Sequence, residues 1–391
     1  MTTIEDGRRI VLSAARPLGE ETVAVTAALG RVLAHDVAAA GDVPPFPNSA
    51  MDGFAVLAGP AGRTLAVVDE SRAGRPAQRA VAEGEAVRIS TGAVVPAGAD
   101  AVVPVEATAE TDGHVEVRAE VARGDHLRAP GEDVRAGEVV LRAGTTLGPA
   151  ELAVAVSAGL AELRCARRPR VAVLTTGDEL VPAGAPLAPG QIHNTNGVAL
   201  AALAGRLGAE VVQQDTVADD RAATDAALAG ALEAADVVLL SGGVSVGPHD
   251  HVKPALAGLG VQERFWRVEL KPGRPTWFGV RGDRLVFGLP GNPVSAAVTF
   301  VLFAAPALRA QQGAPPLPQR RRARLAERVD RLRGREQAVR VRVEERTDGP
   351  VATPTGAQGS HRLSSMLGAD ALAMVPAGED DVTEVDLEPL P

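Results

Sequence analysis

A serine- and glycine-rich loop is the first place in this sequence where residue types and spacing point to chemistry. It follows the apolar run Val237 to Leu240, and a helix is expected after it, from Asp250 to Leu259. Glycines leave backbone N–H groups uncovered, and a helix N-terminus adds a positive dipole, so such a loop can hold a phosphate-like anion. The alternative is plain turn chemistry. The loop residues assigned to ligand binding are Ser241, Gly242, Gly243 and Ser245.

Carboxylates follow the same set of strands. They are Asp178, Glu179, Asp219, Asp220 and Asp250. Carboxylates crowded around an anion would repel it, so a hard divalent cation is the natural mediator, and Mg²⁺ is the metal that we predict. A metal that polarises oxygens suits chemistry at a phosphate or phosphoanhydride. The alternative is that acidic residues at helix N-termini only cap those helices.

Lysine and asparagine are scarce in this sequence. It has 38 Arg but only two Lys, Lys253 and Lys271, and it has four Asn. Such a skew would have replaced Lys and Asn at every position where another residue can serve. The remaining Lys and Asn therefore indicate places where Arg or Asp could not substitute. Lys271 could therefore steady a negative ligand as a point charge. The four Asn are Asn48, Asn194, Asn196 and Asn292, all in turns with Gly or Pro, where a simple turn preference is the alternative explanation.

Composition excludes several classes of partner. At 391 residues the chain is too long for one ordinary core, and a prior of about 150 residues per domain suggests two to four domains. The net charge is −9 and the only basic block is Arg320 to Arg324, so neither nucleic acid nor an anionic membrane is an expected partner. We find no signal-peptide pattern and no apolar run of the roughly 20 residues that span a membrane, so we expect a cytoplasmic protein. Cys165 is the only cysteine, which excludes an intrachain disulfide.

The elements that must position these residues fall into distinct regions. Apolar residues at helical period predict helices over Thr3 to Ala15 and Thr22 to His35, and Pro149 opens another. Between them, Arg63 to Leu147 alternates in strand fashion with frequent turns. We expect residues 1–41 and 142–168 to form a helical N-terminal region, 42–141 an inserted β-rich domain, 169–312 an α/β domain, 313–319 a linker, and 320–391 a small C-terminal β-barrel domain.

Strands and helices alternate from Arg170 onward. Repeated βαβ units predict a three-layer domain, with a parallel sheet between helices, and ligands in such domains bind outside the carboxyl ends of the strands. A hairpin is expected at Arg281 to Asp283. The motifs TTGDEL, SGGVSVGPHD and LPGNP, together with Asp219, all fall at that edge.

An ordered set of motifs resembles the molybdopterin molybdotransferase family, which includes MoeA proteins and the gephyrin E domain. The motifs are PNSAMDGFAV, STGAVVPAGAD, RAPGEDVRAG, TTGDEL, GQIHNTN, SGGVSVGPHD, KPGRP, LPGNPVS and TGAQGSHRLSSM, and they cover essentially the whole chain. The sheet domain by itself also resembles molybdopterin adenylyltransferases. The resemblance to the molybdotransferases implies four structural regions and an elongated homodimer, with each active site between the sheet domain of one subunit and the N-terminal regions of the other.

The same resemblance implies a reaction. Adenylylated molybdopterin is cleaved with the help of Mg²⁺, molybdate is loaded onto the dithiolene, and AMP is released. An adenylyltransferase is a possible partner that supplies the substrate. Two alternatives stay open: a non-catalytic pterin-binding scaffold or carrier, and adenylyl transfer from ATP to molybdopterin.

Site roles can be carried over motif by motif. The resemblance implies catalytic roles for Asp52, Asp133, Glu179 and Asp250, and metal binding by Glu179, Asp219 and Asp250. Asp220, beside Asp219, leaves the register of that ligand open. The remaining implied substrate contacts are Thr91, Asp219, Lys271, Arg274, Pro290, Gly291, Asn292 and Ser360. The chain departs from the family pattern at Phe54, where Tyr is common, at Arg274, where a second Lys is usual, and at Pro248 and His249 before Asp250.

Overall fold

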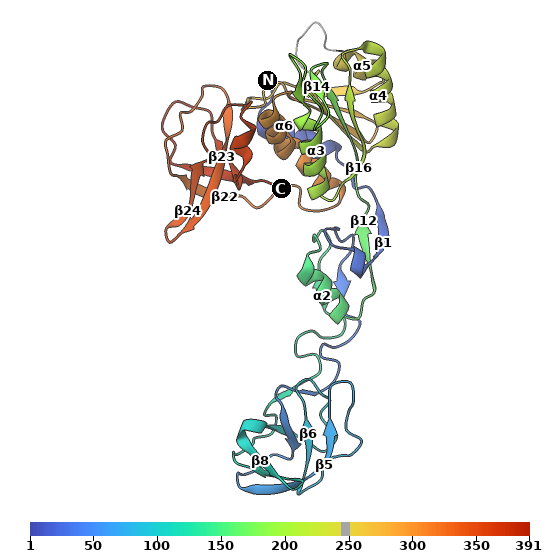
Figure 1. The fold of residues 1–391 in the computed structure, drawn as a ribbon, viewed down its shortest axis with the longest axis vertical. Coiled ribbons are helices and arrows are strands. Elements are labelled where there is room, and N and C mark those ends of the chain that lie inside the picture. The colour runs from blue at the N-terminus through green and yellow to red at the C-terminus, as the bar shows by residue number, and fades with distance from the viewer. Residues whose placement is uncertain (244–250) are drawn as a thin grey trace.

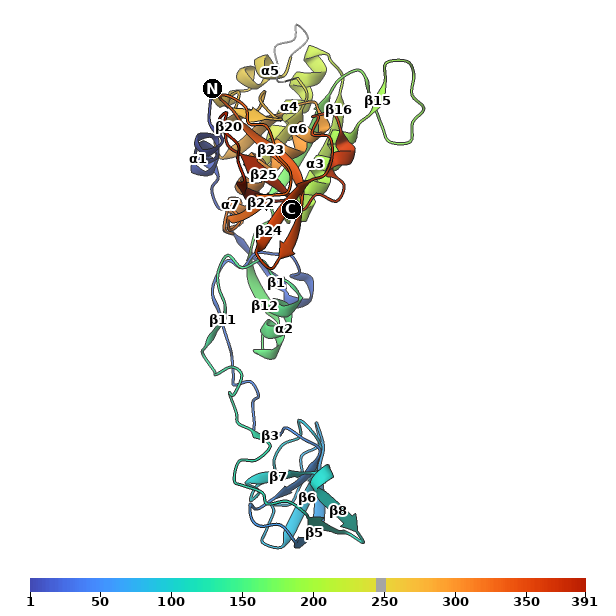
Figure 2. The ribbon, with the colours of Figure 1, turned by 90° about the vertical axis from the view of Figure 1, so that its left-hand side faces the viewer.

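The chain is elongated, with three regions arranged along its long axis (Figures 1 and 2). The computed structural model describes residues 1–243 and 251–391. A sheet domain and a C-terminal β barrel lie side by side at one end, a small middle region follows, and a β domain lies at the far end. The chain passes out to the far domain and back again, so residues from both sides of that domain build the middle region.

The sheet domain contains a six-stranded mixed sheet. Its order is β16 (Glu210–Val217), β13 (Arg170–Thr176), β17 (Val237–Ser241), β21 (Arg284–Leu289), β20 (Trp277–Arg281) and β18 (Gln262–Trp266). The first four strands are parallel, whereas β20 runs opposite to both of its neighbours, β21 and β18, so the prediction of a parallel sheet is wrong at β20. The physical reason is the two-residue connection Gly282-Asp283, which can join only antiparallel neighbours. The hairpin expected at this point is confirmed.

Alternate residues of the central strands enter two different cores. Val171 and Leu239 belong to a core on one face of the sheet, and Leu174 and Leu240 to a core on the other. This double burial explains why β17 is a continuous apolar run. Helices that contact each other on the first face are α3 (Thr195–Arg206), α6 (Pro293–Thr299), α7 (Ala305–Gln311) and α1 (Ile4–Ala14), while α4 (Arg221–Ala234) pairs with α5 (Val252–Gly258) on the second.

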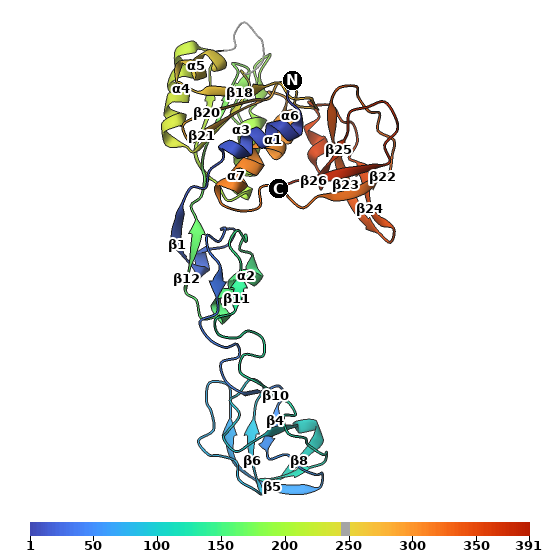
Figure 3. The same ribbon diagram turned by 180° about the vertical axis from the view of Figure 1, so that it is seen from behind.

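Helix α1 differs in location from the prediction. Its residues Ile4 and Val11 are buried in the core of the sheet domain, beside α7, as Figure 3 shows. The first helix of the chain is therefore part of the sheet domain and not of a helical N-terminal region.

The run Pro293–Gln311 is helical throughout, with a π-helical turn at Phe300–Ala304 between α6 and α7. By length and composition it could cross a membrane, so the expectation that the chain has no apolar run of that length is wrong. However, 83% of an 18-residue stretch of this helix is buried inside the protein, as in a core helix.

The middle region is mixed and not helical. The predicted helix over Thr22 to His35 is wrong, because strand β1 (Glu20–Ala24) pairs antiparallel with β12 (Glu162–Ala166) and only a 3-10 turn, Val25–Ala27, follows. The apolar residues of this stretch pack between β12 and α2 (Pro149–Ser157), so their spacing reflects a small mixed core. A second short pair, β2 (Val37–Ala38) with β11 (Val139–Leu141), continues toward the far domain.

The far domain is a six-stranded β sheet around a core that contains Phe54 and Val115. Its order is β7 (Ala101–Pro104), β4 (Gly53–Val56), β6 (Glu85–Ile89), β5 (Arg63–Ser71), β9 (His114–Val117) and β8 (Thr108–Thr111), with a 3-10 turn at Val105–Ala107 and a short pair of β3 (Asn48–Ser49) with β10 (Leu127–Arg128).

The C-terminal domain is a β barrel. Its strands are β23 (Glu336–Arg346), β24 (Gly349–Pro354), β22 (Arg321–Leu325), β26 (Glu384–Pro389) and β25 (Ala371–Val375), and β25 closes the ring by pairing with β23. The short strand β19 (Leu270–Lys271) of the sheet domain also pairs with β23. The segment that contains Lys271 is thereby joined to the barrel.

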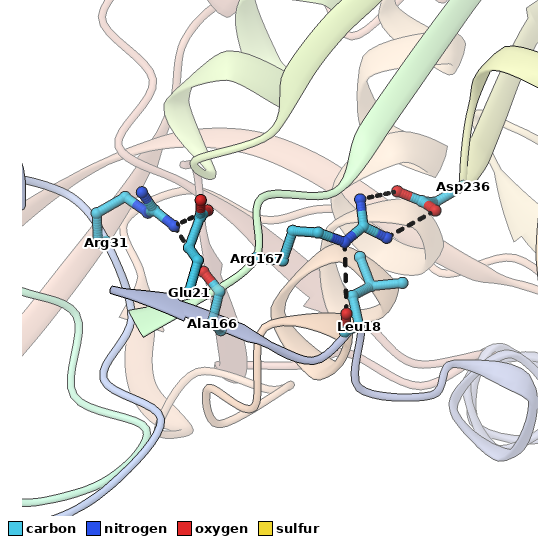
Figure 4. Close-up of polar contacts among 6 residues, drawn as sticks. All are labelled: Leu18, Glu21, Arg31, Ala166, Arg167 and Asp236. Atoms are coloured by element: carbon cyan, nitrogen blue, oxygen red, sulfur yellow. Dashed lines mark hydrogen bonds and ion pairs between the residues drawn. The ribbon is translucent and has the colours of Figure 1, made fainter. Parts of the chain in front are cut away.

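Arg167 attaches the middle region to the sheet domain, and Arg31 makes its bonds within the middle region (Figure 4). Arg167 donates from two guanidinium nitrogens to the Asp236 carboxylate, at 3.2 and 3.0 Å, and from Nε to the Leu18 carbonyl at 3.4 Å. Arg31 donates to Glu21 at 2.5 Å and to the Ala166 carbonyl at 2.8 Å. Because Arg167 lies between β12 and β13, its pair with Asp236 joins the β1–β12 ladder to the sheet domain.

Candidate active site

A cleft of about 1010 Å³ lies at the edge of the sheet where the four parallel strands end. The chain leaves β13 toward β16 on one side and returns to β17 on the other, which is the kind of switch point where ligands bind in open α/β sheets. Eight of the predicted site residues line this cleft: Glu179, Asp219, Ser241, Gly242, Gly243, Pro290, Gly291 and Asn292. Ser245 and Asp250 lie outside the described residues.

Steric contacts explain why glycines follow β17. Gly242 and Gly243 adopt φ values of 96° and 62°, in the left-handed region. A Cβ on Gly242 would lie 2.7 Å from the Thr176 carbonyl oxygen, and one on Gly243 would lie 2.5 Å from a methyl of Val252. Larger side chains are therefore excluded here, and the backbone itself forms this wall of the cleft.

The acidic residues at the edge divide into two kinds. Asp220 caps α4 by accepting from the Ala223 N–H at 2.8 Å, and Asp178 accepts from the Asp219 N–H at 3.0 Å, so both carboxylates serve the backbone. Glu179 and Asp219 line the cleft, and their carboxylates make no hydrogen bond or ion pair with any described residue. The geometry thus distinguishes Asp219 from Asp220. Within residues 1–243 and 251–391, no three His, Cys, Asp or Glu side chains form a metal-binding cluster.

The asparagines connect the loops around the cleft. Asn194 caps α3 by accepting from the Gly197 N–H at 2.9 Å, and its amide donates to the Thr175 and Thr216 hydroxyls. Asn292 donates to the Ser360 hydroxyl at 3.1 Å, which ties the turn before α6 to the barrel.

A second pocket, of about 430 Å³, adjoins the cleft and shares Pro275, Pro290, Asn292 and His361 with it. Lys271, Arg274 and Arg335 line this second pocket, no acidic residue does, and Ser360 contributes a hydroxyl. Three cationic side chains around a small cavity suit an oxyanion. The predicted residues Lys271, Arg274 and Ser360 thus all line this one pocket.

Arg340 lies behind the Ser360 loop and was missed in the sequence. It is fully buried, and burial lowers the pKa of its guanidinium to about 10. It donates to the Ser365 hydroxyl at 3.1 Å and the Gly359 carbonyl at 3.4 Å. The signal that could have found it is an arginine inside the otherwise apolar run from Ala338 to Val341, because a charged residue in a buried strand needs a partner or a role.

The remaining predicted residues lie far from the cleft of the same chain. Asp52 and Thr91 are exposed in the far domain and contact each other, and Asp133 is exposed in the segment that returns from this domain to the middle region. Figure 2 shows this domain at the opposite end of the molecule from the sheet edge. A single chain thus divides the predicted site into two groups.

Models of known protein families match three successive regions of the chain. Residues 2–159 match the model of the MoeA N-terminal region (domain I and II), residues 172–310 a probable molybdopterin-binding domain, and residues 322–388 the MoeA C-terminal region (domain IV). Molybdopterin molybdenumtransferase 2 of Mycobacterium tuberculosis is 39% identical, over 98% of this chain and 97% of its own length. The chain belongs to the molybdopterin molybdenumtransferase family. The family predicted from the motifs is confirmed, and with it a transferase of molybdenum cofactor biosynthesis.

Other members of the family support this assignment. The molybdopterin molybdenumtransferase of Haemophilus influenzae is 40% identical, over 80% of this chain and 78% of its own. The solved structure of the molybdopterin biosynthesis MoeA protein from Pyrococcus horikoshii superposes with a TM-score of 0.82, at 29% identity, and 99% of each chain is covered. The family architecture therefore extends from the first helix to the C-terminal barrel.

Proposed function

We propose that the protein inserts molybdate into adenylylated molybdopterin in a Mg²⁺-dependent reaction that releases AMP. The observation that carries this proposal is the pairing of two adjoining pockets with different electrostatic character. The cleft offers carboxylates and bare backbone, as a metal-bound phosphoanhydride requires, and the second pocket offers cations, as an oxyanion requires. The shared wall at Pro290 and Asn292 brings both ligands within reach of one substrate.

The reaction balances without an oxidant or reductant. Once molybdate occupies the second pocket, water cleaves the phosphoanhydride, so one phosphate leaves as AMP and the other stays on the pterin. The two dithiolene thiols then bind molybdenum and give their protons to one oxo group of molybdate, which leaves as water. Molybdenum stays hexavalent.

The chain's own residues support each part of this chemistry. Glu179 and Asp219 would hold Mg²⁺, because hard carboxylate oxygens without other partners fit that ion. When bound, the metal would polarise the anhydride oxygens. The backbone at Gly242 and Gly243 admits phosphate oxygens closely, and Lys271, Arg274 and Arg335 hold the molybdate. Asp250, predicted as a further ligand, lies outside the described residues.

The active form in this proposal is a homodimer. Asp52, Thr91 and Asp133 carry predicted roles but lie at the opposite end of the molecule from the cleft, so only a second copy can bring them to it. The elongated shape, with the far domain extended from the sheet domain, leaves room for such a reciprocal arrangement. A molybdopterin adenylyltransferase would supply the substrate, and a cytoplasmic location stays a prediction of the sequence.

The deciding experiment measures AMP release from adenylylated molybdopterin with and without molybdate and Mg²⁺. We expect release to need both additions and the product to activate a cofactor-free molybdoenzyme. Lys271→Met should raise the molybdate concentration needed for half-maximal AMP release. The affinity of this variant for adenylylated molybdopterin should stay near wild type. Pterin binding without AMP release would contradict the transferase proposal and favour a carrier.

A further inference from the structure

Asn196 connects the two loops that form the floor of the cleft. It lies in the first turn of α3 and lines the cleft. Its side-chain amide nitrogen donates to the Ser241 hydroxyl at 2.8 Å and to the Gly291 carbonyl at 2.7 Å. Ser241 in turn donates to the Pro290 carbonyl at 3.1 Å. The end of β17 and the turn before α6 are thus joined through one side chain.

These bonds determine which backbone groups remain for a ligand. The carbonyls of Pro290 and Gly291 accept from Ser241 and Asn196, so the two oxygens that would repel an anion are engaged within the protein. The N–H groups of Gly291 and Asn292 make no hydrogen bond with any described residue. The turn therefore keeps donors for an anionic ligand, as anion-binding turns do.

The orientation of the Asn196 amide is fixed by its partner. The Gly291 carbonyl can only accept, so the amide nitrogen must face it. The Asn196 oxygen is buried and accepts no hydrogen bond from a described residue. A buried acceptor without a donor is costly, which indicates that the residue is kept for the bonds made by its nitrogen.

We propose that Asn196 is a positioning residue, which holds the Pro290–Asn292 turn so that its N–H groups face the anionic part of the substrate. This inference rests on the proposed function. It assigns a role to a residue to which the family motif gave none, and Pro290 and Asn292 line both pockets, so the turn affects both ligands.

Asn194 offers a matched control two residues away. Its amide nitrogen also donates two hydrogen bonds, but both acceptors are hydroxyls, Thr175 and Thr216, at 2.7 and 2.9 Å. The Thr216 hydroxyl donates to no described residue, and the Thr175 hydroxyl makes only long contacts, at 3.3 Å to the Asp215 carbonyl and 3.4 Å to the Thr216 hydroxyl. Both hydroxyls can therefore turn and donate to a carboxylate, and an Asp would still cap α3. Asn194→Asp should therefore be tolerated. Asn196→Asp should not, because the Gly291 carbonyl cannot donate and the Ser241 proton is already used.

The test measures binding of AMP to the full-length protein by calorimetry, with thermal unfolding to confirm the fold. At a pH of about 8, Asn196→Asp should weaken AMP binding by about 10-fold, because the hydrogen bond to the Gly291 carbonyl is lost and a carboxylate faces that carbonyl instead. Asn194→Asp should stay within about threefold of wild type. As the pH falls, the introduced carboxyl becomes protonated and can donate to Gly291, so AMP binding by Asn196→Asp should recover relative to wild type at each pH. A merely structural defect would not recover in this way.

Asn196→Ala covers the case in which Asn196→Asp does not fold, because it removes the donor without adding charge, and it should also weaken AMP binding. Wild-type affinity in either Asn196 variant, equal weakening in Asn194→Asp, or no AMP binding by the wild type would overturn the inference. If the wild type binds AMP but releases none from adenylylated molybdopterin, the proposed function fails and the Asn196 role stands. If the wild type releases AMP and Asn196→Asp does so with unchanged kcat and KM, the role fails and the function stands.

Discussion

Thr91 donates two hydrogen bonds to one oxygen of Asp52, from its backbone N–H at 2.7 Å and from its hydroxyl at 3.1 Å. Asp52 directly precedes β4 and Thr91 follows β6, and the antiparallel pairing of Gly53 with Ile89 brings the two together. Both residues are exposed. The second Asp52 oxygen accepts no hydrogen bond from a described residue, so this acidic site is oriented but unused within its own chain.

Mixing two inactive variants should restore activity if the site forms between copies. In a dimer of Asp52→Ala with Glu179→Ala, one of the two sites combines an intact cleft with an intact far domain. Random exchange of subunits should therefore recover about a quarter of wild-type AMP release. A mixture of Asp52→Ala with Thr91→Ala is the control, because both lesions lie in the far domain and no intact site can form. Continued inactivity of the first mixture after proven subunit exchange would contradict the shared site.

Substitution of Asp219 should affect activity, whereas substitution of Asp220 should affect stability. Asp220→Ala removes the N-cap of α4 and should lower the free energy of unfolding by about 1 kcal/mol, with AMP release retained. Asp219→Ala should abolish AMP release with little change in stability, because its exposed carboxylate has no partner among the described residues. Urea unfolding and the AMP assay on both variants check this, and the reverse result would place the ligand at Asp220.

The pair of Arg167 and Asp236 should stabilise the joint between the β1–β12 ladder and the sheet domain. The two-bond geometry and partial burial predict a coupling free energy of about 1 kcal/mol in a double-mutant cycle of Arg167→Ala and Asp236→Ala. Arg168→Ala is the matched control, since this neighbouring arginine forms no ion pair in the described part of the chain. Additive effects of the two substitutions on the free energy of unfolding would refute the coupling.

Glu336 should make stability depend on pH. Burial raises the pKa of its carboxyl above the ordinary value of 4.5, so the folded state favours the protonated form. Its contribution to stability is present below that value and is lost as the pH rises through the raised pKa. The urea midpoint of Glu336→Gln should therefore rise relative to wild type as the pH increases from about 4 to about 8. Glu327→Gln, at an exposed position, controls for loss of one surface charge, and a constant difference for Glu336→Gln would show that the burial has no such effect.

Much of the cleft could be predicted from the sequence, because its signals are local. The apolar run before Ser241, the capping Asn194 and the glycines of the turns each depend on a few neighbouring residues, and the structure places them at one edge of the sheet. The ordered motifs predicted the family for the same reason. Caps, turns and buried strands are short-range features that a reader of the sequence can recognise.

Other features depend on partners far away along the chain, and only the tertiary structure decided them. Glu20 to Ala24 became a strand because Glu162 to Ala166 lies beside it, although the local apolar spacing favoured a helix. Arg340 acquired its role from a loop that folds over it. The sequence by itself thus determined which residues could do chemistry and which buried strands, caps and turns carry them in the cleft. The tertiary structure decided that these residues form two separated groups in one chain, because long-range pairing and burial carry no local signature.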